Sequence, residues 1–300
     1  MGFISEFLSN VEETAKEYGL EVSLNKDQKQ IELLQSSNER KRLSIIVISV
    51  LIFFFALIFL GIVKSLHSSP ERRIVAHPAK AYTYSEEKAS NGFEMHLLKS
   101  DPSNITLEVV NKNVTLSDYY GINGGFFFGD RLLSIAMVNG KPAGGDMGQY
   151  GAGHENVKYP RGTLLWDGVT NQLSVQIVSQ ASELKVTDPA HYWAQGGISM
   201  SIGHDDLWES QANIEHAPFA DDKRLRSALV YDQAGNIYLI VSSTKGTLSD
   251  FRAAILETVG EGQLVDGIFL DGDGSSQLQA KELWLPGDNR PIVEMLRLLR

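Results

Sequence analysis

The pattern of hydrophobic and polar positions begins with one long apolar run near the N-terminus. Residues 43–63 read LSIIVISVLIFFFALIFLGIV, which is 21 residues with no charged residue, no Asn, no Gln and no Pro. At about 1.5 Å rise per residue, a helix of this length is about 31 Å long and matches a hydrocarbon core of about 30 Å. A buried core helix normally shows a polar face, and this run shows none. The pattern therefore predicts one membrane-spanning helix.

The residues before this run predict how the chain is oriented and divided. A cleaved signal peptide has an apolar region of about 7–15 residues close to the N-terminus, whereas 42 residues precede this run. The basic cluster Arg40-Lys41-Arg42 directly before the run favours a cytoplasmic N-terminus. We therefore expect a single-pass protein of the cell membrane, with a cytoplasmic segment at 1–42, a stalk at 64–80 and an extracellular domain at 81–300.

Beyond the stalk, short apolar runs separated by turn residues predict a domain rich in β-strands. Runs dominated by Val, Ile, Leu and aromatic residues recur at Thr106–Val110, Leu132–Val138, Gly162–Trp166, Leu173–Val178, Ala228–Tyr231, Ile237–Val241 and Gly267–Leu270. Two helices are expected, at Leu248–Val259, which Thr247 and Asp250 open like a capping box, and at Ile292–Leu299. The pattern predicts an α+β fold with mixed β-sheets and a few helices, preceded by one transmembrane helix.

Composition and charge argue against one class of partner, nucleic acids, and exclude disulfide bonds as a source of stability. The chain has 300 residues and a formal net charge of −10, and most of the acidic excess lies in residues 64–300. Nucleic-acid-binding domains carry basic faces, so this balance argues against a nucleic-acid partner. The chain contains no cysteine, so its core rather than disulfides must hold the domain. An anionic substrate would need local positive groups to overcome the acidic field.

Two glycine-rich segments are the strongest candidates for a functional site. The first is Gly121–Phe128, which reads GINGGFFF, and the second is Ile268–Leu278, which reads IFLDGDGSSQL. Each places a polar side chain and nearby glycines at the end of an apolar run. Glycines there let the backbone approach a ligand closely and present N–H groups to an anion. Two tight turns without a ligand are the alternative.

Four motifs, taken in order, resemble those of the phosphodiester glycosidase family. They are Asn123-Gly124-Gly125-Phe126-Phe127, the pair Gly196-Gly197, Arg226-Ser227-Ala228 before a strand, and Leu270-Asp271-Gly272-Asp273-Gly274-Ser275-Ser276. The resemblance covers about residues 90–285, and its last motif is the most specific. It implies an enzyme that hydrolyses the glycosidic bond of a sugar-1-phosphodiester.

The resemblance, together with what this chemistry needs, suggests a role for each motif. It implies catalytic roles for Asp271, Asn123 and Asp273, with Asp271 as the carboxylate that stabilises or attacks the anomeric carbon. Arg226 is expected to bind the phosphate through charge-assisted bidentate hydrogen bonds. The remaining substrate-binding candidates are Gly124, Gly125, Phe126 or Phe127, Gly196, Gly197, Gly272, Gly274, Ser275 and Ser276.

Asp273 departs from the family's pattern, which usually has a glycine at this position. A second carboxylate beside a phosphate would repel it by a few kcal/mol if it were desolvated and unpaired. It could instead hold a cation or donate a proton. The alternatives for the other two charged candidates are a turn-capping role for Asp271 and a surface ion pair of Arg226 with Asp221 or Asp222.

No cofactor and no dedicated metal site are predicted. Residues 271–282 carry oxygen-bearing side chains at the spacing of an EF-hand calcium loop, but Ser276 stands where that loop needs glycine. The helices that flank such a loop are also missing from the pattern. A divalent cation held by Asp271 and Asp273 is left open. The histidines lack the spacing of a helical zinc site.

These features predict a membrane-anchored extracytoplasmic hydrolase. The expected partners are a sugar-phosphate or envelope glycopolymer substrate and the membrane, which the chain meets through one helix; no nucleic acid is expected. The alternatives are a non-catalytic module that binds an envelope glycopolymer, and an assembly module whose N-terminal segment recruits a partner. Turnover of a sugar-1-phosphodiester separates the first prediction from the binding module, and function retained after deletion of residues 1–42 would weigh against the assembly module.

Overall fold

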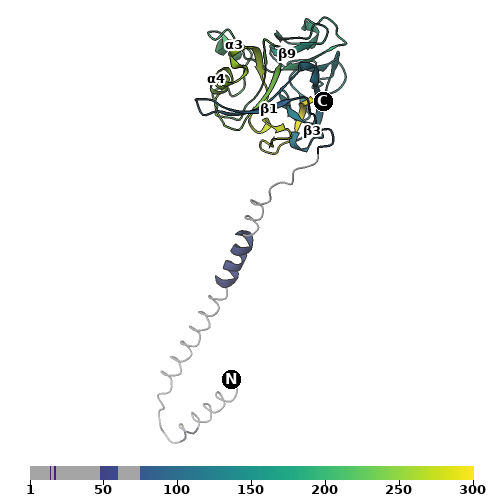
Figure 1. Ribbon diagram of the computed structural model, residues 1–300. Helices are drawn as coiled ribbons and strands as arrows, with labels where there is room; N and C mark the ends of the chain where they lie inside the picture. Colours follow the sequence, from purple (N-terminus) through teal and green to yellow (C-terminus); the bar gives the residue numbers. More distant parts are fainter. Residues whose placement is uncertain (1–13, 15–16, 18–47, 60–74) are drawn as a thin grey trace. The chain divides into compact units, whose positions relative to one another are not determined.

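The computed structural model describes residues 14, 17, 48–59 and 75–300 (Figure 1). The chain divides into two units, Met1–Arg72 and Arg73–Arg300. In the first unit, residues 48–59 are helical and every one of them is exposed. Among the residues that the structure describes, no helix is both long and apolar enough to cross a membrane. The predicted span 43–63 falls partly outside these residues, so it stays a prediction.

The largest sheet of the second unit has six strands and is buried on both faces at its centre. Its order is β1 (Thr83–Lys88), β2 (Glu94–Ser100), β14 (Ile237–Ser242), β13 (Ser227–Asp232), β15 (Leu264–Phe269) and β12 (Ile198–Ser199), with every neighbouring pair antiparallel. Along β13, Leu229 packs into one hydrophobic cluster, whereas Ala228 and Val230 pack into a second. Because both faces are covered, the predicted runs Ala228–Tyr231 of β13 and Ile237–Val241 of β14 are continuously hydrophobic.

Two five-stranded sheets and a two-stranded ribbon complete the strand structure. The first five-stranded sheet runs β10 (Gln172–Val178), β9 (Arg161–Asp167), β11 (Tyr192–Gly196), β7 (Ala136–Val138) and β8 (Lys141–Pro142). The second runs β17 (Trp284–Leu285), β16 (Leu278–Gln279), β4 (Gly121–Asn123), β18 (Ile292–Leu298) and β3 (Ile105–Lys112), and the ribbon pairs β5 (Phe127–Phe128) with β6 (Arg131–Leu132). Strands outnumber helices, and all pairings between these named strands are antiparallel.

Two α-helices lie together at one side of this unit (Figure 1). The first is α3 (Trp208–Ile214) and the second is α4 (Leu248–Thr258). The two helices are in contact, because the guanidinium of Arg252 in α4 lies 5.1 Å from the centroid of the Trp208 ring in α3. The predicted capping box is confirmed: Asp250 N–H donates to the Thr247 hydroxyl, and Thr247 N–H donates to the Asp250 carboxylate. Short 3₁₀ turns occur at Pro102–Asn104, Val114–Leu116, Ala181–Glu183, Gly260–Gly262 and Asp273–Ser275.

The predicted helix at Ile292–Leu299 is wrong, because these residues form strand β18. This strand lies between β3 and β4 and is buried over most of its length. In a short run that is mostly apolar, the spacing of apolar residues does not distinguish a strand from a helix. The secondary structure of these residues is therefore determined by their pairing with the two neighbouring strands. The predicted strand Leu132–Val138 is also divided, into β6 and β7, whereas the other predicted strands are confirmed within a few residues.

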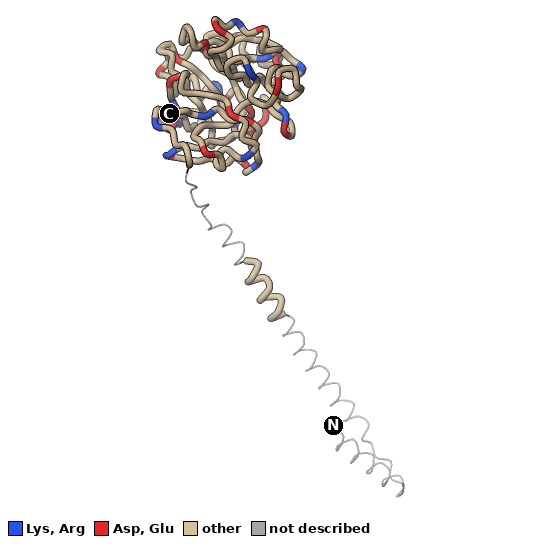
Figure 2. Tube along the Cα trace, turned by 90° about the vertical axis from the view of Figure 1, so that its right-hand side faces the viewer, with Lys and Arg blue, Asp and Glu red and all other residues tan. Residues whose placement is uncertain are grey.

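Positions of acidic and basic residues are interspersed along the chain of the second unit. Figure 2 shows Lys and Arg positions mixed with Asp and Glu positions along the tube, without a basic stripe on the side that faces the viewer. A single-sign charged face is therefore not apparent from this side.

Candidate functional site

The two glycine-rich segments meet in the folded domain although about 150 residues separate them. Asn123 ends β4 and Asp271 follows β15, and the Asn123 side chain donates from Nδ2 to the Asp271 carbonyl oxygen at 2.9 Å. The Asp271 N–H points in turn at the Gly124 carbonyl oxygen, 3.4 Å away. Each segment therefore fixes the backbone of the other.

The Asn123 amide is fully occupied within the protein. Its oxygen accepts from the Ser227 hydroxyl at 2.9 Å and from the Gln277 N–H at 3.1 Å, and only 1% of the residue is exposed. Its nitrogen donates to two carbonyl oxygens, those of Gly124 and Asp271. The amide oxygen accepts two hydrogen bonds and the amide nitrogen donates two, so the side chain has no position left for a ligand. Asn123 therefore holds the two segments together and positions Asp271.

Asp271 presents a carboxyl group to a pocket of about 130 Å³ in the domain. Burial raises the pKa of this carboxyl to about 6, although the Ser275 hydroxyl and Arg290 both favour its charged form. A carboxyl group with such a pKa is a common feature of catalytic sites, because it can be charged or neutral near physiological pH. The Gly272 N–H also donates to the Asp271 carboxylate at 3.1 Å, so the side chain caps this turn as well as lining the pocket.

Three arginines line the same pocket, together with two aspartates and several apolar side chains. The full lining is Phe126, Ile198, Ala217, Pro218, Phe219, Arg224, Arg226, Leu248, Phe269, Leu270, Asp271, Gly272, Asp273 and Arg290. Among the lining residues themselves, three guanidinium groups accompany two carboxyl groups, and two further carboxylates, those of Asp222 and Asp288, pair with Arg224 and Arg290 from beside the cavity. The arginines therefore offer hydrogen-bond donors to an anionic ligand without giving the site an excess of positive charge.

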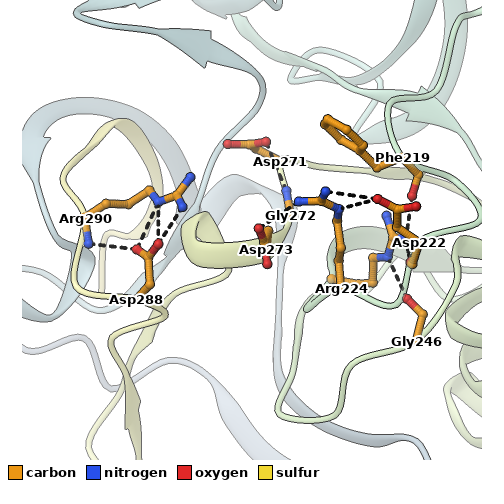
Figure 3. A network of polar contacts seen from close by, with 10 residues as sticks. Phe219, Asp222, Arg224, Gly246, Asp271, Gly272, Asp273, Asp288 and Arg290 are labelled. Carbon is orange, nitrogen blue, oxygen red and sulfur yellow. Dashed lines mark hydrogen bonds and ion pairs between the residues drawn. The ribbon is translucent and has the colours of Figure 1, made fainter.

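Arg224 and Asp273 form one side of the pocket (Figure 3). The Arg224 guanidinium donates to the Asp273 carboxylate at 2.8 Å and to the Asp222 carboxylate at 3.0 Å, and it lies 3.9 Å from the centroid of the Phe219 ring. Asp273, which has a left-handed φ of 55°, is thus paired with an arginine. The repulsion of a phosphate that an unpaired Asp273 would cause is reduced accordingly.

Arg290 and Asp288 form the opposite side, with Asp271 between the two arginine pairs (Figure 3). The Arg290 guanidinium contacts both Asp288 oxygens at 2.9 Å from Nε, and this carboxylate raises the pKa of Arg290. A Cβ at Gly274 would lie 2.2 Å from the Asp288 carboxyl carbon. Gly274 therefore makes room for the Asp288–Arg290 pair.

Arg226 differs from its two neighbours because its guanidinium is held by backbone carbonyls. It is only 5% exposed, and it donates to the carbonyl oxygens of Gly246 at 3.1 Å, Phe219 at 2.9 Å and Asp222 at 2.7 Å. The alternative of a surface ion pair with Asp221 or Asp222 is therefore wrong. Arg226 borders the pocket and fixes the loop that carries Phe219.

The remaining candidates divide between the pocket and the packing around it. Phe126 and Gly272 line the pocket, whereas the Phe127 side chain packs into the hydrophobic core. Gly196 and Gly197 lie outside the lining: a Cβ at Gly197 would lie 2.2 Å from the Phe269 carbonyl oxygen, so this glycine permits close packing of β12 on β15.

Ser275 and Ser276 are both buried beside Asp271 but behave differently. The Ser275 hydroxyl hydrogen-bonds to the Asp271 carboxyl and lowers its pKa, which opposes the effect of burial. The Ser276 hydroxyl has no hydrogen-bond partner among the residues that the structure describes. Within the same residues, no group of three or more His, Cys, Asp or Glu side chains is arranged to hold a metal ion.

Sequence reasoning missed Arg224, Arg290 and Phe219 as pocket residues. A signal for the two arginines is present, because Asp222-Lys223-Arg224 and Asp288-Asn289-Arg290 share the spacing Asp-x-Arg, one on each side of the second glycine-rich segment. An aspartate two residues before an arginine can orient the guanidinium locally, as both pairs do here. The signal for Phe219 is conformational and cannot be seen in sequence: its φ is 53°.

Comparisons with known proteins show a likeness of fold. No family model matches the chain, and no curated protein matches it. The catalytic domain of zebrafish N-acetylglucosamine-1-phosphodiester alpha-N-acetylglucosaminidase, auto-inhibited by its pro-peptide, is similar with a TM-score of 0.53 and 14% identity, over 76% of this chain and 86% of that one. A hypothetical protein from Synechocystis is similar with a TM-score of 0.41 and 14% identity, over 72% of this chain and 61% of that one. The zebrafish likeness agrees with the resemblance that the four motifs indicated.

Proposed function

We propose that the domain hydrolyses the bond between the anomeric carbon of a sugar and a phosphodiester. The observation that carries this proposal is a partly buried carboxyl group, Asp271, with a raised pKa at the wall of a pocket that three arginines also line. Such a pocket offers one group for the sugar carbon and several for the phosphate. The likeness to a phosphodiester glycosidase domain supports this choice at the level of fold.

Asp271 is the group that acts at the sugar carbon. With a pKa of about 6, roughly nine-tenths of this carboxyl is ionised at pH 7. The carboxylate faces the anomeric carbon and stabilises its developing positive charge or attacks it, as one carboxylate does in glycosidases. The bond from the anomeric carbon to the phosphate oxygen breaks, water supplies the new hydroxyl of the sugar, and a phosphate monoester and a proton are released.

Arg224 and Arg290 are the groups that bind the phosphate. They flank Asp271 from two sides, and each is already oriented by an aspartate (Figure 3). Phosphate departs as a stable anion, so the positive field of the two guanidinium groups replaces most of the need for a general acid. Arg226 supports them indirectly, because its donors are committed to the loop carbonyls of Phe219 and Asp222.

The substrate and location follow from the same reasoning. We propose that the domain acts outside the cell membrane, anchored by the predicted helix at 43–63, on sugar-phosphate linkages of an envelope glycopolymer. Phe126 and Phe269 supply the apolar part of the pocket against which a sugar ring can pack. Asp273 keeps Arg224 in place and does not need to bind a cation for this role.

The test is hydrolysis of a panel of sugar-1-phosphodiesters by the full-length chain in mild detergent. The panel includes matched sugar-1-phosphate monoesters and aryl glycosides without phosphate, which report the need for a diester. We expect turnover of at least one diester, and loss of at least about 100-fold in Asp271→Asn. Asp221→Asn is the matched control, because Asp221 is exposed and lies outside the pocket lining.

A non-catalytic role gives a different outcome in the same experiment. A module that only binds an envelope glycopolymer would retain the polymer and release no reducing sugar from any diester. It would also bind equally well after Asp271→Asn, since removing one negative charge from the pocket does not weaken the hold on an anion. Binding without turnover, with and without added divalent cations, would replace the proposed function by this alternative.

A further inference from the structure

Glu294 is a buried carboxyl group that the proposed reaction does not use. It lies in β18, it is 3% exposed, and neither of its carboxyl oxygens has a hydrogen-bond partner of good geometry among the described residues. Its side chain lies against the glycine turn after β4, because a Cβ at Gly124 would be 1.9 Å from Glu294 Oε2. The carboxyl group therefore occupies the space that a side chain at position 124 would fill.

No salt bridge with Glu294 occurs among the residues that the structure describes. The strands packed around it carry few ionisable groups: Glu108 and Lys112 on β3, Arg297 on β18 itself, and none on β4. Arg297 is paired with Glu108 at 2.9 Å. None of these groups shifts the Glu294 pKa, which burial raises to about 8 against a small opposing effect of the Gly125 backbone. The group is consequently neutral at pH 7, which is unusual for a glutamate.

A short chain of contacts leads from Glu294 to Asp271. Gly124 donates its N–H to the Glu294 carbonyl oxygen at 2.9 Å, so the turn is bonded to the backbone of β18 and packs against the Glu294 side chain. The Gly124 carbonyl oxygen is approached by the Asp271 N–H at 3.4 Å and accepts from Asn123 Nδ2 at 3.1 Å. A shift of the Gly124 turn therefore moves the backbone that carries Asp271.

We propose that Glu294 is a positioning residue whose neutral side chain holds the Gly124–Gly125 turn in place, and whose ionisation displaces this turn and with it Asp271. A buried charge without a cation beside it is costly, and the turn is the part of the backbone against which the Glu294 side chain lies. The turn is itself buried and Gly125 is packed closely against Gln195, Gly196 and Ser134, so its displacement also shifts these neighbours. The proposal goes beyond the hydrolysis proposed above, and its test measures folding and local opening instead of activity.

The sign of the pH effect follows from the two pKa values of the glutamate. In the folded chain the pKa is about 8, and the ordinary value is 4.5, so between these pH values the folded state holds one more proton than the unfolded state. Stability is full below pH 4.5 and falls as pH rises, until it levels off above about 8. Within this window, Glu294 makes the unfolding equilibrium constant rise about tenfold per pH unit.

Between pH 6.5 and 8, the dependence of stability on pH comes mainly from Glu294. Asp271 has completed most of its titration there, since its pKa is about 6. His96, whose pKa burial lowers, contributes below its ordinary value of 6.5. Because Glu294 is itself half ionised at pH 8, we expect it to raise the unfolding equilibrium constant of the full-length protein by about 15-fold over this interval.

The experiment compares the full-length protein with Glu294→Gln and with Glu86→Gln, an exposed control on β1. Denaturant unfolding is followed at pH 6.5 and pH 8, and hydrogen exchange of residues 121–128 is measured at the same pH values and corrected for intrinsic rates. Glu294→Gln should lose this change of about 15-fold and keep the turn protected at pH 8. The parent and Glu86→Gln should lose protection in this segment as pH rises.

Two results would overturn the proposal. One is an unfolding equilibrium of Glu294→Gln that keeps the parent's dependence on pH between 6.5 and 8. The other is a segment 121–128 whose protection in the parent is the same at both pH values. If Glu294→Gln does not fold, Glu294→Met provides the same comparison, because it also removes the titrating group while filling the same space. Loss of hydrolysis has no bearing on either readout, so failure here and failure of the proposed function remain distinct.

Discussion

Replacement of Asp271 by asparagine should stabilise the folded protein near neutral pH while it abolishes turnover. Burial raises the pKa of this carboxyl from 3.8 to about 6, so the folded state resists its ionisation. A shift of one pKa unit corresponds to about 1.4 kcal/mol, so ionisation of Asp271 costs the folded state about 3 kcal/mol at pH 7. Asparagine keeps the shape of the side chain and an acceptor oxygen without the charge.

The direction of the pH dependence is fixed by the raised pKa. Stability due to the neutral carboxyl is fully present below pH 3.8 and is lost as pH rises to about 6. The difference in unfolding free energy between Asp271→Asn and the parent should therefore grow by about 2–3 kcal/mol between pH 4 and pH 7. All other groups titrate equally in both proteins, so they cancel in this difference.

Chemical denaturation of the two full-length proteins at pH 4, 5, 6 and 7 measures this difference. Asp221→Asn provides the matched control and should show a difference that does not change with pH, because Asp221 is exposed. The reasoning is refuted if Asp271→Asn is less stable than the parent at pH 7 by the same amount as at pH 4. Such a result would mean that the carboxyl is not desolvated in the pocket.

Three further substitutions test the parts of the fold that position the site. Arg226→Met should lower the unfolding free energy by about 2–3 kcal/mol, because the buried Gly246 carbonyl oxygen and the partly buried ones of Phe219 and Asp222 lose their donor; a loss below about 1 kcal/mol in a denaturant titration would contradict the role of Arg226 in fixing this loop. Gly197→Ala should prevent accumulation of folded protein, since its Cβ would lie 2.2 Å from the Phe269 carbonyl oxygen. Gly203→Ala, whose Cβ would have nothing within 4 Å, should lower the unfolding free energy by only about 1–2 kcal/mol because of its left-handed φ. Equal thermal stability of the two variants would contradict this reasoning. Thr247→Ala should cost about 1 kcal/mol through the loss of the α4 cap, and an unchanged denaturation midpoint would show that the cap contributes nothing.

Local signals in the sequence were sufficient for the central strands and for α4. Strands β13 and β14 are buried on both faces, so each is a continuous apolar run bounded by polar or turn residues. The helix α4 has a capping box at its start and a period of buried positions along its length. In these elements, local preference and tertiary position agree, and the sequence prediction therefore succeeds.

Where tertiary position decides, the sequence prediction failed. Strand β18 has the length and composition of a short buried helix, and only its place between β3 and β4 makes it a strand. Strands β1 and β2 were missed because charged and polar residues interrupt them, as in Glu86, Glu87 and Lys88. Such strands gain their stability from pairing with a neighbour, which no local window contains.

The candidate site was predicted in part for the same reason. The two glycine-rich segments were recognisable because each ends an apolar run with a polar residue, and the fold brings Asn123 and Asp271 together. The assignment of Arg226 as the phosphate ligand could not anticipate that backbone carbonyls would occupy its guanidinium. Arg224 and Arg290 could be identified only from the folded pocket, because they come from loops on either side of the second segment.

The most direct test of the proposed function is to determine which bond the protein breaks. A sugar-1-phosphodiester that it turns over is hydrolysed in water enriched in ¹⁸O, and the sugar and the phosphate monoester are analysed separately by mass spectrometry. Attack at the anomeric carbon, as proposed for the pocket of Asp271, Arg224 and Arg290, predicts the label in the sugar and none in the phosphate. Label in the phosphate would show cleavage at phosphorus and would contradict the account.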